Sequence, residues 1–211
     1  MKLQELFDYL KENLYTTVAD ALKVKHFLIK ENDDLLVQIP YSSDFVFRFY
    51  YYLQLRIFIS YGHLIPGLDI NGLIGGSTDL FSPAAINLPA KNMCQLLRDE
   101  IKIDENRLHL GLKYLANDGR AVWELNQNGD IITIKDWTNG WDDGSVLENY
   151  LSDYNEVAPW QKNILDEFGG YIDGNHICMD INVKTQDDFI KGIINYLHMT
   201  VLIASGHRYM N

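Results

Sequence analysis

The chain opens with apolar residues at the spacing of a helix. Because they fall on one stripe, they predict an amphipathic helix from Leu3 to about Tyr15. Similar stripes predict helices over 90–101 and 160–168, and a last helix that begins after Thr185 and ends at a cap on Gly206. Ser145 and Glu148 form a capping box, which predicts one more helix before Pro159.

Between these helices the apolar period changes to two, which is typical of strands. Two short runs, 25–30 and 35–39, flank a polar turn and predict a hairpin. The alternation in 45–49 and 53–60 predicts two further strands. Runs over 108–114, 121–125 and 131–134 predict a meander with a tight turn at Asn128-Gly129. A final strand is expected over 176–183.

The stretch 62–89 holds five glycines and three prolines, which predicts a long irregular loop. The 211 residues fit one domain, with a possible subdivision into 1–61, the loop 62–89, and 90–211. Strand runs interrupted by single helices favour the α+β class over a parallel βαβ fold. We therefore expect an antiparallel sheet, or sheets, of about six to eight strands, with N-terminal, central and C-terminal helices packed on one face.

The charge balance limits the possible partners. The net charge is −11, and twelve acidic residues against two lysines fall between Asp136 and Asp188. Nucleic-acid binding and anionic membranes both need a basic surface, so we expect neither as a partner. A basic protein partner is compatible with such a field. The acidic stretch has a plainer interpretation as a solvated face that keeps the protein soluble.

The two cysteines and the N-terminal pattern indicate the cellular compartment of the protein. Cys94 and Cys178 are far apart and suggest two buried thiols rather than a disulfide framework. The N-terminal pattern lacks the apolar core of a signal peptide, and no apolar run is long enough to span a membrane. The reducing cytoplasm, of a bacterial cell, is the expected location.

A search for catalytic and ligand-binding patterns predicts no enzyme, no cofactor and no metal site. The six histidines lack ligand spacing, and GLIGGST at 72–78 fits no phosphate-binding motif. If the protein is an enzyme without a known motif, His63, beside the glycine-rich loop, is the first candidate residue.

The loop after the meander combines tryptophans with acidic residues. Tryptophan is favoured at the centres of protein interfaces, so this loop predicts a partner contact, although both tryptophans could instead pack on the core. The candidate partner-binding residues extend into the following helices: Trp137, Trp141, Asp142, Asp143, Tyr150, Tyr154 and Trp160.

From about Asn92 to Leu165 the chain resembles the type III secretion chaperone and YbjN-like families. The residues that carry the resemblance are the Leu96-Leu97 pair, the strand LHLGLKY, the hairpin after it, and a helix that ends near Trp160. The closing segment ICMDINVKTQDDFIKGIINYLH resembles the last strand and helix of the YbjN-like group. The resemblance implies a non-enzymatic, often dimeric module whose apolar surface accepts an extended partner segment.

A second stretch, ANDGRAVWELNQNGDIITIKDW, is similar to the core hairpin of the SUKH-type immunity superfamily. That resemblance implies an acidic protein that binds a toxin. The sequence thus predicts a chaperone-like or regulatory protein-binding module, and the first resemblance implies a homodimer. The alternatives are an immunity protein that neutralises a basic toxin and an enzyme without a recognisable motif.

Overall fold

A computed structural model describes residues 1–29, 45–68, 86–114, 120–137, 157–174 and 176–209. In chain order its elements are α1 (Leu3–Ala21), β1 (His26–Ile29), α3 (Phe45–Tyr61), the 3-10 turn η1 (Gly62–Leu64), β2 (Ile86–Pro89), α5 (Ala90–Glu100), β3 (Lys102–Asp104), β4 (Arg107–Lys113), β5 (Arg120–Asn128), β6 (Ile131–Asp136), α6 (Pro159–Phe168), β7 (Gly170–Asp173), β8 (His176–Asn182) and α7 (Gln186–Tyr209).

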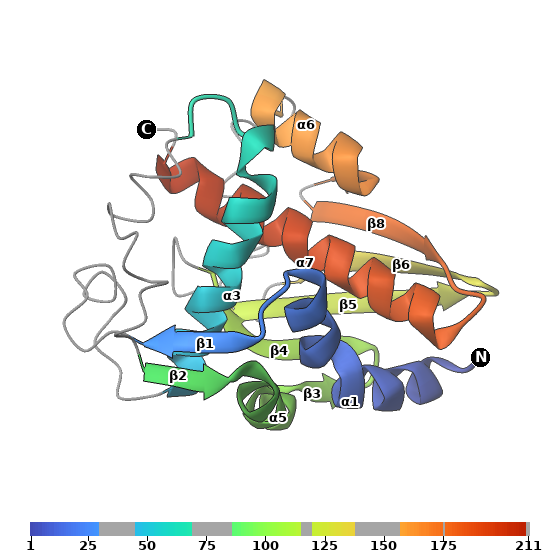
Figure 1. The fold of residues 1–211 in the computed structure, drawn as a ribbon. Coiled ribbons are helices and arrows are strands. Elements are labelled where there is room, and N and C mark those ends of the chain that lie inside the picture. Colours follow the sequence, from blue (N-terminus) through green and yellow to red (C-terminus); the bar gives the residue numbers. More distant parts are fainter. Residues whose placement is uncertain (30–44, 69–85, 115–119, 138–156, 175, 210–211) are drawn as a thin grey trace.

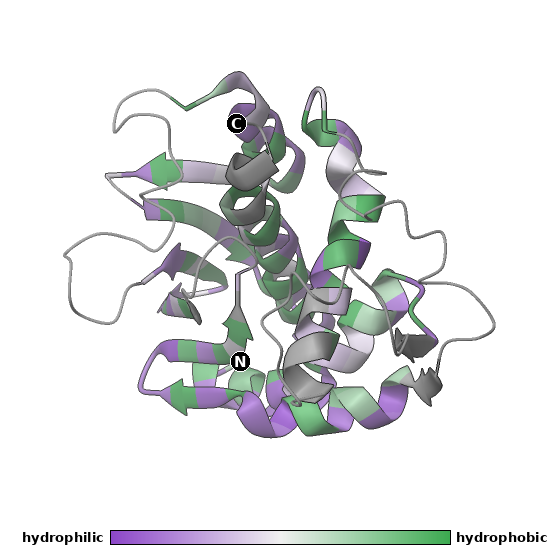
Figure 2. Cartoon of the chain, turned by 90° about the vertical axis from the view of Figure 1, so that its left-hand side faces the viewer, coloured by the Kyte–Doolittle hydropathy of each residue, from purple (hydrophilic) through white to green (hydrophobic). Residues whose placement is uncertain are grey.

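Six strands form one antiparallel sheet in the order β3-β4-β5-β6-β8-β7, and β1 pairs with β2 in a separate two-stranded sheet. The helices lie in front of the large sheet in Figure 1. Figure 2, turned by 90°, shows the sheet on the left and the helices on the right as two layers. The α+β class and the packing of helices on one face are therefore confirmed. Among the described residues, no helix is long and apolar enough to cross a membrane.

Helix α1 is confirmed, and it continues six residues beyond the predicted end, to Ala21. Its apolar stripe is fully buried against α5 and α7. The helix ends where Lys23 takes a left-handed backbone conformation, with φ of 56°. The buried stripe comprises Leu6, Phe7, Leu10, Leu14 and Val18.

Helix α3 replaces the two strands predicted over 45–49 and 53–60, so that prediction is wrong. Leu53, Leu55 and Ile57 do alternate along the sequence, but their neighbours Gln54 and Phe58 are buried as well. A helix that is buried nearly all round carries no clear 3.6-residue period. The residues of α3 favour strands by propensity, and burial between α7 and the sheet overrides that preference.

Of the predicted hairpin of 25–30 with 35–39, the first strand is present as β1, and the second lies outside the described residues. β1 pairs with β2, which lies at the end of the predicted loop 62–89. Residues 35–39 and most of that loop, including 72–78, fall outside the described residues. The loop's described beginning is η1, where His63 is exposed.

The meander of β4, β5 and β6 is confirmed, with its second turn shifted by one residue. Asn128 still pairs with Ile131, so the turn is Gly129-Asp130, and Gly129 has φ of 64°. Besides β2, two short strands of the large sheet were not predicted: β3, and β7, which begins at Gly170 where a break was expected. Gly169 ends α6 in a left-handed conformation, with φ of 75°, and the chain then turns directly into β7.

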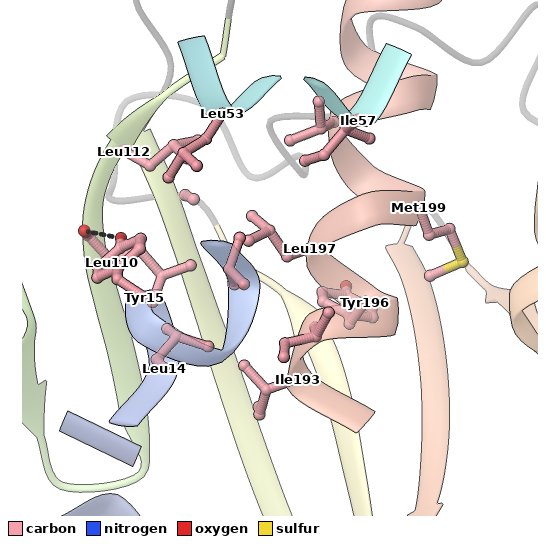
Figure 3. Close-up of a cluster of buried hydrophobic side chains, with 14 of the residues drawn as sticks. Leu14, Tyr15, Leu53, Ile57, Leu110, Leu112, Ile193, Tyr196, Leu197 and Met199 are labelled. Atoms are coloured by element: carbon pink, nitrogen blue, oxygen red, sulfur yellow. Dashed lines mark hydrogen bonds between the residues drawn. The ribbon is translucent and has the colours of Figure 1, made fainter. Parts of the chain in front are cut away.

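A β-bulge in β4 anchors two helices to the sheet. Between the pairs His109–Val122 and Lys113–Arg120, β4 has three residues and β5 has one. The hydroxyls of Tyr15 in α1 and Tyr50 in α3 each donate a hydrogen bond of 2.8 Å to the carbonyl oxygen of Leu110 within this bulge (Figure 3). Burial raises the pKa of Tyr15 well above its ordinary value, so the hydroxyl remains a donor.

We expect the two tyrosines to share their contribution to stability. Tyr15→Phe and Tyr50→Phe should each lower the free energy of unfolding by about 1 kcal/mol, because one donor still reaches Leu110. The double variant should lose more than the sum, because removing both donors costs the buried carbonyl about 1–3 kcal/mol in desolvation. Urea unfolding of the four proteins measures this, and strictly additive losses would contradict shared anchoring.

The predicted C-cap at Gly206 is wrong, because α7 continues to Tyr209. Gly206 is instead a close-packing position. A Cβ placed there would lie 2.9 Å from Cζ3 of Trp160 and 3.1 Å from Cδ1 of Ile65. Trp160, in α6, is only 8% exposed, so its indole belongs to the contact between α6 and α7.

Gly206→Ala should therefore destabilise the protein. In an open helix this change gains about 1 kcal/mol, whereas overpacking costs about 1–3 kcal/mol. The same change in a Trp160→Phe background should cost less, because the smaller ring leaves room for the methyl group. Thermal unfolding of Gly206→Ala in the wild-type and Trp160→Phe backgrounds, each against its parent, tests the contact. A stabilising effect of Gly206→Ala would show that α6 does not pack closely against this residue.

Candidate functional site

The face of the large sheet that points away from the helices, called the outer face below, carries most of the exposed polar side chains of the strands. Alternate residues of each strand point to the buried side, as Leu108, Trp123 and Ile134 do. The strand register sets the remaining residues side by side. The outer face consists of Lys102, Asp104, Arg107, His109, Val122, Glu124, Asn126, Asn128, Ile131, Thr133, Lys135, Trp137, Tyr171, Asp173, His176, Cys178, Asp180 and Asn182.

Trp137 and Arg107 form the main aromatic contact of the outer face. Trp137 directly follows β6, and its backbone N–H donates a hydrogen bond of 2.9 Å to the carbonyl oxygen of Val122. The guanidinium carbon of Arg107 lies 4.0 Å from the centre of the indole, within cation–π range. Both side chains are half-buried. The backbone of Trp137 is thus bonded to β5, and its indole is in contact with Arg107.

A carboxylate orders the other end of the outer face. Asp180 accepts hydrogen bonds from the hydroxyl of Thr133 at 2.6 Å and from that of Tyr171 at 3.1 Å. Partial burial and the bond to Asp180 raise the pKa of Tyr171 to about 12. Tyr171 therefore remains a neutral donor at neutral pH, and the three side chains link β6, β8 and β7.

Asp136 fixes the junction between β6 and β8. Its side chain is buried, and its Oδ1 accepts a hydrogen bond of 2.8 Å from the backbone N–H of Ile177. Nδ1 of His176 lies 3.0 Å from the backbone oxygen of Asp136 and 3.7 Å from Oδ1. These contacts continue the pairing of the two strands beyond the last ladder pair, Lys135–Cys178. Their role is to position the strand end that carries His176.

Neither cysteine has the character of a nucleophile. Both are buried, as predicted. Burial raises the pKa of Cys94 to about 12 and that of Cys178 to about 11, so both remain thiols at neutral pH. In the parts of the chain that the structure describes, no three His, Cys, Asp or Glu side chains are grouped to hold a metal ion.

The predicted contact residues divide into three groups. Trp137 lies on the outer face, whereas Trp160 is buried and has no exposed ring to offer a partner. The others lie outside the described residues: Trp141, Asp142, Asp143, Tyr150 and Tyr154. The expected apolar surface is not a continuous strip on the described outer face, because its two exposed large apolar residues, Ile131 and Tyr171, are separated by polar neighbours.

Arg107, Thr133 and Asp180 are residues of this face that the sequence did not single out. Each lies on a strand that was predicted, but its neighbours belong to strands far away in sequence. Their grouping follows from the register, which periodicity alone does not give.

A scan against protein-family models, a search of curated proteins and a search of solved structures each found no match to this chain.

A second polar feature lies in the core, between α3, α6 and α7. His198 is 1% exposed, and neither of its ring nitrogens bonds to any described residue. The imidazole packs against the rings of Tyr61 and Phe168, with centroid distances of 5.1 Å and 6.2 Å. Burial lowers the pKa of His198 to about 4, so the ring is neutral in the folded protein at neutral pH.

This burial predicts a specific pH dependence. Above the ordinary pKa of 6.5, both folded and unfolded states hold a neutral ring. As the pH falls from about 6.5 towards 4, the unfolded state takes up a proton that the folded state resists, so stability decreases, by about 3 kcal/mol in all. Below about 4 the contribution is constant. Urea unfolding across this range should show a smaller decrease for His198→Phe than for the wild type, and parallel curves would contradict the assignment.

Proposed function

We propose that this protein binds another protein through the outer face of its sheet, with Trp137 and Arg107 at the centre of the contact. The observation that carries the proposal is the contact between Trp137 and Arg107 on the outer face, where both residues are half-buried and the guanidinium carbon lies 4.0 Å from the centre of the indole. We further propose that the protein is cytoplasmic and acts by binding rather than by catalysis.

The chemistry of this pair favours protein recognition. Tryptophan and arginine are both enriched among the residues that dominate binding energy. An indole that already packs against Arg107, on a backbone bonded to Val122, loses little conformational freedom when a partner covers it. The surrounding charged residues, such as Glu124, Lys135 and Asp180, suit a polar rim.

The polar character of the described outer face also specifies the mode of binding. The chaperone-like resemblance implied an apolar surface that accepts an extended segment. The described surface instead presents one aromatic–arginine centre among charges. We therefore propose contact with a folded surface or loop of the partner, rather than the covering of a long apolar segment.

Affinity capture from a native lysate tests the proposal. A partner retained by the wild type should be lost with Trp137→Ala and weakened by Arg107→Ala, since truncation of a central residue commonly costs about 2 kcal/mol or more. Tyr9→Ala and Arg98→Ala are matched controls. They remove the same kinds of side chain from α1 and α5, on the opposite side of the sheet, and should leave capture unchanged.

Two results would overturn the proposal. Equal capture by Trp137→Ala and the wild type, with both variants folded, would remove the indole from the contact. The absence of any stoichiometric partner would favour the alternative of an enzyme that acts on a small molecule.

A second candidate function is the neutralisation of a basic toxin. It is favoured by Asp173 and Asp180, two acidic residues of the outer face within the acidic stretch, and by the net charge of −11. Binding of this kind should weaken steeply as salt rises, because screening acts on exposed charges. If capture persists at high salt, neutralisation of a basic toxin through charge is excluded, and binding centred on Trp137 and Arg107 is retained.

A further inference from the structure

Among the described strands, β3 lies at one edge of the large sheet and is hydrogen-bonded on one side only. Its partner is β4, in the register Lys102–His109, Ile103–Leu108 and Asp104–Arg107. The two-residue turn closes at the pair Asp104–Arg107. In a hairpin of this kind the closing pair exchanges its backbone hydrogen bonds, and the next residue directs its N–H and C=O the other way. The backbone groups of Ile103 therefore face outward along the open edge.

The charges of the three residues of this edge are complementary to those of a second, antiparallel copy. When a second copy of β3 pairs antiparallel about a two-fold axis through Ile103, each Lys102 lies opposite the other copy's Asp104. The two Ile103 residues then exchange backbone N–H and C=O bonds. The charged pairs fall at the non-hydrogen-bonded positions, where facing side chains are closest.

We infer that the protein forms a homodimer by antiparallel pairing of β3 with β3 of a second copy. The inference uses the open edge of β3 rather than the Trp137–Arg107 contact, although Asp104 of this edge is the ladder partner of Arg107. The partner at this edge is a second copy of the chain, because antiparallel pairing about Ile103 sets Lys102 of each copy opposite Asp104 of the other. Such an interface is isologous, as most dimer interfaces are.

The helix layer beside this edge supports the inference. Figure 1 shows α5 and β3 close together in the lower part of the molecule, and only Ile101 separates them in sequence. The buried stripe of α5 includes Met93, Cys94 and Leu97. Leu96 lies outside that stripe and is 50% exposed, the highest value among the exposed large apolar side chains of the described residues. A second copy along this edge would bring further surface against α5.

The opposite edge of the sheet lacks this complementarity. Antiparallel self-pairing of β7 about Ile172 would set Tyr171 opposite Asp173, with no cation on either copy. The hydroxyl of Tyr171 is already bonded to Asp180. The two edges therefore differ in chemistry, and β3 is the one that matches itself.

The dimer has a consequence for the outer face. Pairing at β3 joins two six-stranded sheets into one continuous sheet, with both outer faces on the same side. The two Trp137–Arg107 contacts would then lie on one surface, where they could engage a two-fold symmetric partner or two copies of it.

Sedimentation equilibrium of the full chain at moderate salt tests the inference by charge exchange. The wild type should be a dimer at micromolar concentrations. Lys102→Asp and Asp104→Lys each set like charges across the seam and should weaken the dimer about tenfold or more. The double exchange, Lys102→Asp with Asp104→Lys, restores opposite charges and should restore the dimer. A mixture of the two single variants should form a heterodimer.

Circular dichroism and urea unfolding check that each variant remains folded, which is expected because both side chains are exposed. A wild type that stays monomeric up to about 100 μM, far above ordinary dimer affinities, would overturn the inference. So would a dimer that neither single exchange weakens, or a weakened dimer that the double exchange fails to restore.

Discussion

The shared hydrogen bonding of one carbonyl group holds the two layers of this protein together. The bulge in β4 leaves the Leu110 oxygen outside the ladder with β5, and the hydroxyls of Tyr15 and Tyr50 both bond to it. Gly111 has φ of 71°, and a Cβ there would lie 2.9 Å from the Tyr50 hydroxyl. Only glycine therefore fits at position 111 of the bulge, and the bulge makes the Leu110 oxygen available to both tyrosines. With α1 and α3 fixed on one side of the sheet, the outer face lies on the opposite side.

Periodicity predicted the elements that bury only one stripe or one face. The helices α1 and α5 and the strands β4, β5, β6 and β8 are of this kind, because each has a polar side that marks its period. Helix α7 shows such a side only in its first half, because residues 196–204 are all buried. It did not predict α3, whose neighbouring residues Gln54, Leu55, Ile57 and Phe58 are all buried. The short strands β3 and β7 also escaped, since three or four residues contain too few alternations to define a period.

The candidate site was predicted in part. Trp137 was named because tryptophan beside acidic residues is typical of contact surfaces, and that reasoning is local. Arg107 lies thirty positions earlier, and only the pairing of β4, β5 and β6 brings it to the indole. Trp160 carries the same local signal, yet it is buried against Gly206. Residue type identified the candidates, and tertiary packing decided which of them is accessible.

Site-specific photo-crosslinking is the most direct test of the central claim, that the outer face binds the partner. A photoreactive residue at position 124 would stand on the outer face, and one at position 9 on α1 would stand on the opposite side. The account predicts that the partner is crosslinked from position 124 and not from position 9. Crosslinking from position 9 alone would place the partner on the helices and contradict the account.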